Sequence, residues 1–246
     1  MAFNQLITCF VAACRNNVLK NNGQPTVIEL GNQTLRTGKL IKKIFNGFGI
    51  DPNTTVSTVK DYYIGLGFTK YLAIDVNTDK DAVAMDLNLD IVNHYNFKEK
   101  FDLVTNNGTG EHCFNQYNVF LNTHNLCKKN GFIVHVLPFY RFFDHGFYNF
   151  HPNLFISLAH HNEYVIHKLC IASSDCEIFH EFDVSKNYFS ENFLKNINID
   201  QYHKDIMIAV IYEKNHEKPF RMPMQHVYGG SNINSDDITQ RYYEKT

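Results

Sequence analysis

Residues 101–112 read FDLVTNNGTGEH, an apolar run that passes directly into a polar turn with two glycines. The chain has five such apolar runs, and the first part of this segment, Phe101 to Asn106, is one of them. The others are Thr26 to Leu30 (TVIEL), Tyr71 to Asp75 (YLAID), Ala82 to Asp86 (AVAMD) and Gly131 to Leu137 (GFIVHVL). Near-continuous apolar runs are typical of parallel strands that are covered on both faces. We therefore predict strands at these five places.

Helical patterns alternate with these runs. They cover Leu35 to Phe45, Val56 to Leu66, Phe114 to Lys129 and Asn153 to His161. This alternation predicts an α/β fold with a doubly wound sheet and right-handed crossovers. Two later runs, Tyr164 to Ala172 and Asp205 to Tyr212, are separated by a segment with little helical periodicity. We expect these two strands to pair antiparallel.

The first 24 residues predict a helix. An apolar stripe at helical spacing is formed by Phe3, Leu6, Ile7, Phe10, Cys14 and Val18. A lipoprotein cleavage box is suggested by the residues around Cys14, but no Lys or Arg precedes it and polar residues interrupt the apolar stretch. We predict a single domain: the helix in 1–24, the core in 25–214 with a helical insertion at about 35–69, and a tail in 215–246 with a candidate helix from Ser235 to Lys245.

The composition disfavours several function classes. The chain has 246 residues, 44% of them hydrophobic, and a formal net charge of −2, so it can fill a core but has no basic field for nucleic acid. Its apolar runs are far shorter than the roughly 20 residues that span a bilayer. The six cysteines include no CxxC pair, which favours reduced thiols over a disulfide framework or zinc site. We expect a cytoplasmic protein with a small-molecule partner and no membrane or nucleic-acid partner.

Polar residues at the carboxyl ends of the first three runs predict a ligand site, because ligands of open α/β sheets bind beyond these ends. Gly31 follows the first run and lets a ligand approach the backbone. Asp75 closes the second run, where a carboxylate can accept hydrogen bonds from both ribose hydroxyls. Asp86 closes the third run, where it can accept from the adenine amine. Each residue alone would be an ordinary turn former or cap, but together they favour an adenosine pocket.

The same motifs carry a family resemblance. The segments VIELGNQ (27–33), YLAIDVN (71–77), AVAMDLN (82–88) and FDLVTNNGTGEH (101–112) resemble successive motifs of class I S-adenosylmethionine-dependent methyltransferases. Glu111-His112 is similar to an "EH" signature of the small-molecule branch, after strand 4. The resemblance spans about residues 25–175. It implies a Rossmann-like methyltransferase fold, with a mostly parallel seven-stranded sheet and an antiparallel last strand, and S-adenosyl-L-methionine as cofactor.

The resemblance also implies roles for individual residues. The residues implied in cofactor binding are Glu29, Gly31, Asn32 and Gln33 on the methionine and ribose side, Asp75 and Val76 at the ribose, Asp86 and Leu87 at the adenine, and Asn106 and Gly108 at the sulfonium. Asn32 and Gln33 replace the glycine-rich continuation that is usual in the family.

The acceptor side is expected after the fourth and fifth strands. The candidate catalytic bases are His145, His151 and His112, and the candidate substrate contacts are Tyr140, Arg141 and Tyr148. The dense aromatic residues from Phe139 to Phe155 either wall a substrate pocket or pack this loop onto the sheet. No metal site is expected.

Three functions remain open at this point. The first is methyl transfer to O or N of a small-molecule or saccharide-type acceptor. The second is a non-catalytic S-adenosylmethionine-binding or regulatory protein of the same fold. The third, a dinucleotide-dependent enzyme, is disfavoured because the turn after the first strand lacks the G-x-G-x-x-G pattern and has Gln33 where a second glycine is needed.

Overall fold

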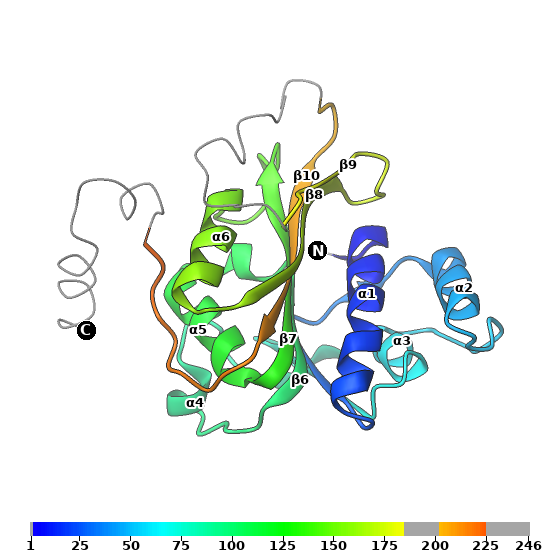
Figure 1. Cartoon of the computed structure of the whole chain (residues 1–246), viewed down its shortest axis with the longest axis horizontal. Coiled ribbons are helices and arrows are strands. Elements are labelled where there is room, and N and C mark those ends of the chain that lie inside the picture. Colours follow the sequence, from blue (N-terminus) through cyan, green and yellow to red (C-terminus); the bar gives the residue numbers. More distant parts are fainter. Residues whose placement is uncertain (1, 185–201, 225–246) are drawn as a thin grey trace.

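The computed structural model describes residues 2–184 and 202–224, which form a central sheet with helices on both faces (Figure 1). The sheet has eight strands in the order β5-β4-β2-β6-β7-β10-β8-β9. In this order the strands cover Val83–Ala84, Lys70–Asp75, Thr26–Leu30, Phe101–Asn107, Cys127–Tyr140, Ile206–Lys214, Val165–Ser173 and Phe179–Glu181. The strands from β5 to β7 are parallel, whereas β10 lies antiparallel between β7 and β8.

The predicted fold class is confirmed, including the mostly parallel sheet and the antiparallel last strand. The five runs between residues 26 and 137 become β2, β4, β5, β6 and β7, and the two later runs become β8 and β10. The predicted number of strands was wrong by one, because β9 forms an antiparallel edge beside β8. The strand order reverses between β2 and β6, so the ligand edge lies at their carboxyl ends.

Three predicted helix boundaries were wrong by three residues. The helix expected from Val56 begins at Val59, because the Thr58 side chain caps it. The helix expected from Leu35 begins at Gly38, because Thr34–Leu35 form β3 and pair with β1 (Ala2–Phe3). The helix expected to reach Lys129 ends at Leu126. There the buried ammonium of Lys214 donates hydrogen bonds to the carbonyl oxygens of His124 at 2.8 Å and Cys127 at 3.0 Å. These bonds place a cation at the helix C-terminus, where the Cys127 amide also donates to the carbonyl oxygen of His124.

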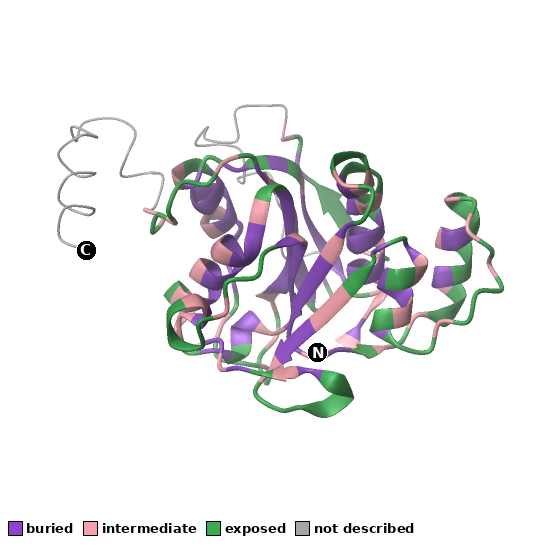
Figure 2. Cartoon of the chain, turned by 90° about the horizontal axis from the view of Figure 1, so that it is seen from below, coloured by how far each residue is buried: buried purple, intermediate pink, exposed green. Residues whose placement is uncertain are grey.

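Helices lie on both faces of the sheet (Figure 1). On one face lie α1 (Gln5–Asn21), α2 (Gly38–Gly47) and α3 (Val59–Gly65); on the other lie α4 (Ile91–His94), α5 (Gln116–Leu126) and α6 (Pro152–His161). Figure 2 shows the central strands buried, and the helices buried toward the sheet and exposed on their outer sides. The predicted N-terminal helix is confirmed. It begins after Asn4, whose side chain accepts a hydrogen bond from the Ile7 amide at 3.0 Å.

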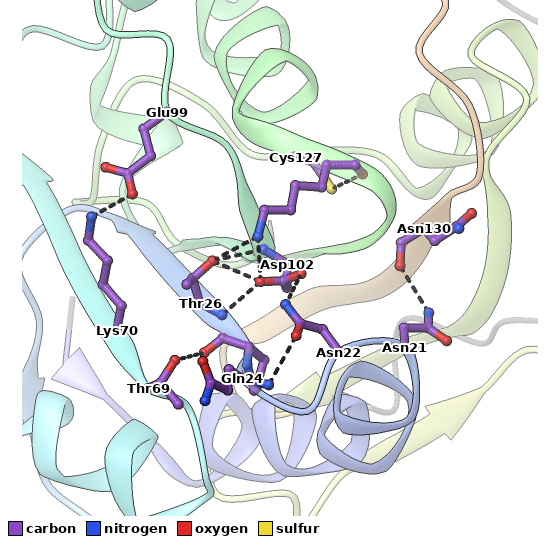
Figure 3. Close-up of polar contacts among 12 residues, drawn as sticks. Asn21, Asn22, Gln24, Thr26, Thr69, Lys70, Glu99, Asp102, Cys127 and Asn130 are labelled. Atoms are coloured by element: carbon purple, nitrogen blue, oxygen red, sulfur yellow. Dashed lines mark hydrogen bonds and ion pairs between the residues drawn. The ribbon is translucent and has the colours of Figure 1, made fainter.

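Asp102 links the amino ends of β2, β6 and β7 through hydrogen bonds (Figure 3). Its Oδ2 accepts hydrogen bonds from the Thr26 amide and the Lys128 ammonium, both at 2.8 Å, and its Oδ1 accepts from the Asn22 side chain at 3.1 Å. Burial alone would raise the pKa of Asp102, but the bonds from Lys128, Asn22 and Thr26 lower it overall. This edge is therefore fixed by structural polar contacts, and it lies opposite the ligand edge.

The start of the C-terminal tail lies along α5 and α6. The carbonyl oxygen of Lys218 is 2.8 Å from Nε2 of His124, and the Asn162 side chain donates to the carbonyl oxygen of Arg221 at 2.9 Å. The candidate helix from Ser235 to Lys245 lies outside the described residues. Within the described ranges, no helix has both the length and the apolar character needed to cross a membrane.

Candidate ligand site at the carboxyl edge

A cavity of about 300 Å³ lies at the carboxyl ends of β2, β4 and β6. Ligand pockets range from about 300 to 1,000 Å³, so this one suits a ligand of nucleoside size. The cavity is lined by Gly31, Asn32, Gln33, Asp75, Val76, Met85, Asp86, Leu87, Asn88, Gly108, Thr109, His112 and Cys113. Eight of the ten residues implied in cofactor binding are among them, and the exceptions are Glu29 and Asn106.

Asp75 presents a carboxylate at the end of β4. Its Oδ2 accepts a hydrogen bond from the Asn32 amide at 2.8 Å, and its Oδ1 accepts from the Asn77 side chain at 3.0 Å. These contacts fix the carboxylate between two turns. Because an ionised carboxylate has about four acceptor positions, it retains capacity for a ligand hydroxyl. The next residue, Val76, is 75% exposed and provides an apolar surface beside it.

Asp86 and Leu87 occupy the neighbouring turn after β5. The Asp86 Oδ1 accepts from both the amide and the side chain of Asn88 at 2.8 Å, and the Asp86 amide donates to the Tyr95 hydroxyl at 3.0 Å. Leu87 is buried against the apolar core. The turn therefore combines a fixed carboxylate with an apolar wall, which is the chemistry that an adenine ring and its amine require.

The turn after β2 is closed more tightly. Gly31 has a φ of +90°, and a Cβ added there would lie 2.0 Å from Oγ1 of Thr109. The Gln33 side chain donates to the carbonyl oxygen of Asn107 at 2.8 Å and to Oγ1 of Thr109 at 3.2 Å. The space above the glycine, on the side where the resemblance implies the methionine part, is therefore filled by Thr109.

Glu29 and Asn106 do not line the cavity but support it from behind. The Tyr71 hydroxyl donates to Oε2 of Glu29 at 2.9 Å, and burial raises the pKa of this carboxyl to about 8 despite that bond. Asn106 accepts from the Gly110 amide at 2.9 Å and contacts Nδ1 of His135 at 3.3 Å. Both side chains therefore hold the ends of β2 and β6 in place.

One predicted base, His112, lines the cavity, and a second, His145, lies directly beside it. The two imidazole rings have centroids 4.7 Å apart. Both face the buried carboxylate of Glu111, whose Oε1 is 3.1 Å from Nε2 of His145 and 3.7 Å from Nε2 of His112. Glu111 and His112 belong to the short 3-10 helix η2 (Gly110–His112), and His145 belongs to the loop after β7.

The third predicted base lies elsewhere. His151 caps the N-terminus of α6, where its Nδ1 accepts from the Asn153 amide at 3.2 Å. It lines a separate cavity of about 500 Å³ with residues that include Ser157 and Pro223. The prediction of a base over the cavity was therefore wrong for His151, because this histidine serves as a helix cap.

The predicted substrate contacts do not line the cavity either. The Tyr148 hydroxyl donates to the carbonyl oxygen of Phe114 at 2.9 Å, which fixes the loop to the start of α5. Arg141 is exposed and has a φ of +70°. Among the aromatic residues of this loop, Phe150 is 4% exposed and packs in the core, whereas Phe143 is 89% exposed. None of them lines the cavity of about 300 Å³.

Four lining residues have no counterpart among the predicted site residues: Met85, Asn88, Thr109 and Cys113. The first two flank the Asp86-Leu87 pair, so their positions next to a predicted ligand turn were the available signal. Thr109 and Cys113 are four residues apart across η2, where the Cys113 thiol lies 3.9 Å from the Thr109 carbonyl oxygen. Their place depends on how this turn folds back over Gly31.

Comparisons with known proteins give similarity of structure only. No protein-family model matches the sequence, and no curated protein matches it. A 1,6-didemethyltoxoflavin-N1-methyltransferase from Burkholderia thailandensis is 11% identical, with 86% of this chain and 82% of that chain covered and a TM-score of 0.46. The N-methyltransferase NodS from Bradyrhizobium japonicum WM9 is 10% identical over 87% of this chain and 89% of that chain, with a TM-score of 0.46.

A SAM-dependent methyltransferase from Archaeoglobus fulgidus is 15% identical over 84% of this chain and 94% of that chain, with a TM-score of 0.45.

Proposed function

We propose that this chain is an S-adenosylmethionine-dependent methyltransferase that acts on O or N of a small-molecule or saccharide-type acceptor. The observation that carries the proposal is the joint placement of Asp75 and Asp86 around one cavity at the reversal point of the sheet. This is the placement that the motif resemblance implies for the ribose and adenine contacts.

The lining residues fit the nucleoside part of the cofactor. Asp75 provides acceptors for ribose hydroxyls, Val76 and Leu87 provide apolar surfaces, and Asp86 provides an acceptor for the adenine amine. The amino-acid part fits only if Thr109 moves away from Gly31, because the two residues are in contact. Gln33 is bonded to Thr109, so it would move as well.

The cofactor, when bound, supplies an activated methyl group on a positively charged sulfur. What this chain must then contribute is mainly the alignment of the acceptor, since an in-line displacement depends on positioning. A proton must be removed only where the acceptor atom still carries one. His112 and His145 lie beside the cavity, and an imidazole nitrogen that holds no other ligand can accept this proton.

The second candidate, binding without turnover, is favoured by one specific observation. The contact of Thr109 with Gly31 occupies the side on which the methionine part is expected. A regulatory protein of the same fold, which need not hold the methionine part for methyl transfer, could keep this contact. The dinucleotide alternative is disfavoured because the same turn has one glycine and a bonded Gln33.

Isothermal titration calorimetry and thermal unfolding with four ligands separate these functions. We expect S-adenosylmethionine and S-adenosylhomocysteine to bind and to raise the melting temperature, since a ligand at 100 times its Kd stabilises a protein by about 2.7 kcal/mol. NAD should give no shift. Adenosine binding equal to that of S-adenosylhomocysteine would favour the non-catalytic candidate, and a larger shift with NAD would overturn the proposal. Methyl transfer to a panel of hydroxyl and amine metabolites then tests turnover.

A further inference from the structure

Three side chains beside the cavity converge on one point. Glu111, His112 and His145 each offer one ligand atom, and these atoms lie within 4.8 Å of one another. The two distances from Oε1 of Glu111 to the histidine nitrogens are 3.1 and 3.7 Å. Two ligands of a tetrahedral ion, each about 2.1 Å from it, are about 3.4 Å apart. The observed distances lie on either side of this value.

The carboxylate in this cluster lacks a second partner. The Glu111 side chain is 0% exposed, and within the described residues its Oε2 has no hydrogen-bond partner. Leaving a buried carboxylate oxygen unpaired is energetically costly, because the charge loses its hydration. A cation held between Oε1 of Glu111 and the two histidines would offset the charge of the buried carboxylate.

The backbone holds the cluster in place, in addition to the hydrogen bond between His145 and Glu111. The Phe147 amide donates to the carbonyl oxygen of Glu111 at 2.7 Å. Gly146 has a φ of +66°, and a Cβ added there would lie 2.9 Å from Cγ of Glu111. The loop can therefore bring Nε2 of His145 to 3.1 Å from Oε1 of Glu111 only because residue 146 is a glycine. The two histidine side chains are 45% (His112) and 28% (His145) exposed, so an ion can reach them from solvent.

We propose that Glu111, His112 and His145 bind one divalent first-row transition-metal ion, with Zn²⁺ as the reference ion. Two imidazole nitrogens and one carboxylate oxygen suit such ions better than Mg²⁺ or Ca²⁺, which prefer oxygen ligands. Three protein ligands leave at least one position for water or a ligand oxygen. This differs from the sequence-based expectation of no metal site, because Glu111 and His145 are 34 residues apart in the chain.

The proposal does not depend on the cofactor, so its test uses the metal alone. The full-length chain is stripped with a chelator and titrated with Co²⁺, whose visible absorption reports the ligand geometry, and with Zn²⁺ by calorimetry. We expect one site per chain and no displacement of Co²⁺ by millimolar Mg²⁺. Glu111→Gln, His145→Ala and His112→Ala should each weaken binding more than about 100-fold, since even second-shell partners contribute 10–100-fold.

His167→Ala is the matched control, because it removes an imidazole from a His–Glu pair away from the cavity, 2.7 Å from Glu213. This variant should bind as the wild type does. Circular dichroism establishes whether each variant folds, and the half-exposed His112 gives the decisive variant if Glu111→Gln does not fold. Absence of a one-to-one site in the wild type, or equal Co²⁺ affinity in the folded His112→Ala variant, would overturn the proposal.

Discussion

Replacing Asp75 with alanine gives the sharpest test of the cavity as an adenosine site. The carboxylate has about four acceptor positions, and three contacts with the Asn32 and Asn77 turns already use part of this capacity. One ribose hydroxyl can take the free position, and the second can share Oδ1 with the Asn77 amide, whose contact at 3.3 Å is the longest of the three. A hydrogen bond to a charged group contributes about 1.5–3 kcal/mol, so the two together contribute about 3–6 kcal/mol.

We therefore expect Asp75→Ala to raise the Kd for S-adenosylhomocysteine by at least about 100-fold in titration calorimetry. Asn77→Ala is the control, because it removes one turn contact of Asp75 but lines no part of the cavity. Its Kd should stay within about threefold of the wild type, well under the 1.4 kcal/mol that a tenfold change represents. An unchanged Kd in a folded Asp75→Ala protein would refute the assignment of this carboxylate to the ribose.

Three further predictions concern stability and are measured by urea unfolding. Gly31→Ala should lower the free energy of unfolding by about 1–3 kcal/mol, because its Cβ would meet a hydroxyl oxygen at 2.0 Å, whereas Gly38→Ala, with nothing within 4 Å, should raise it by up to about 1 kcal/mol. Equal effects of the two substitutions on the free energy of unfolding would contradict the close packing of Thr109 against Gly31. The folded pKa of Glu29 is raised to about 8 from an ordinary 4.5, so its stabilising contribution is complete below pH 4.5 and declines up to pH 8 by up to about 1.4 kcal/mol per unit. Glu29→Gln should flatten the dependence of the free energy of unfolding on pH. If this variant keeps the wild-type pH dependence, Glu29 is not the group responsible for it. Asp102→Asn should cost about 1.5–3 kcal/mol, and Glu99→Gln, which breaks an exposed ion pair, less than about 0.5 kcal/mol. A reversed order would show that the amino edge is fixed by other contacts.

The strands and the ligand edge were predictable because they depend on local patterns. The run from Thr26 to Leu30 coincides with β2, and Asp75 and Asp86 follow their strands on the predicted side of the sheet. Apolar runs and the residues that end them are set by neighbours in the chain, so periodicity reveals them.

Contacts between distant turns were not predictable in the same way. The closure of Gly31 by Thr109 depends on how two loops meet. The pairing of Glu111 with His145 depends on the left-handed conformation of Gly146, the residue after His145. His151 shows the opposite case. The proline that follows it is typical of the first turn of a helix, so the local sequence places His151 at a helix N-terminus.

The glycine at position 146 has a consequence for how relatives of this chain should be read. A homologous sequence could keep all three polar residues of the Glu111 cluster and still lose their geometry, if a larger residue stood at the position of Gly146. Conversely, a homologous sequence could keep this geometry with another residue at position 147, since only the backbone amide of Phe147 contacts Glu111. The smallest residue of the loop is therefore a better diagnostic for this site in a sequence alignment than its most exposed aromatic residues.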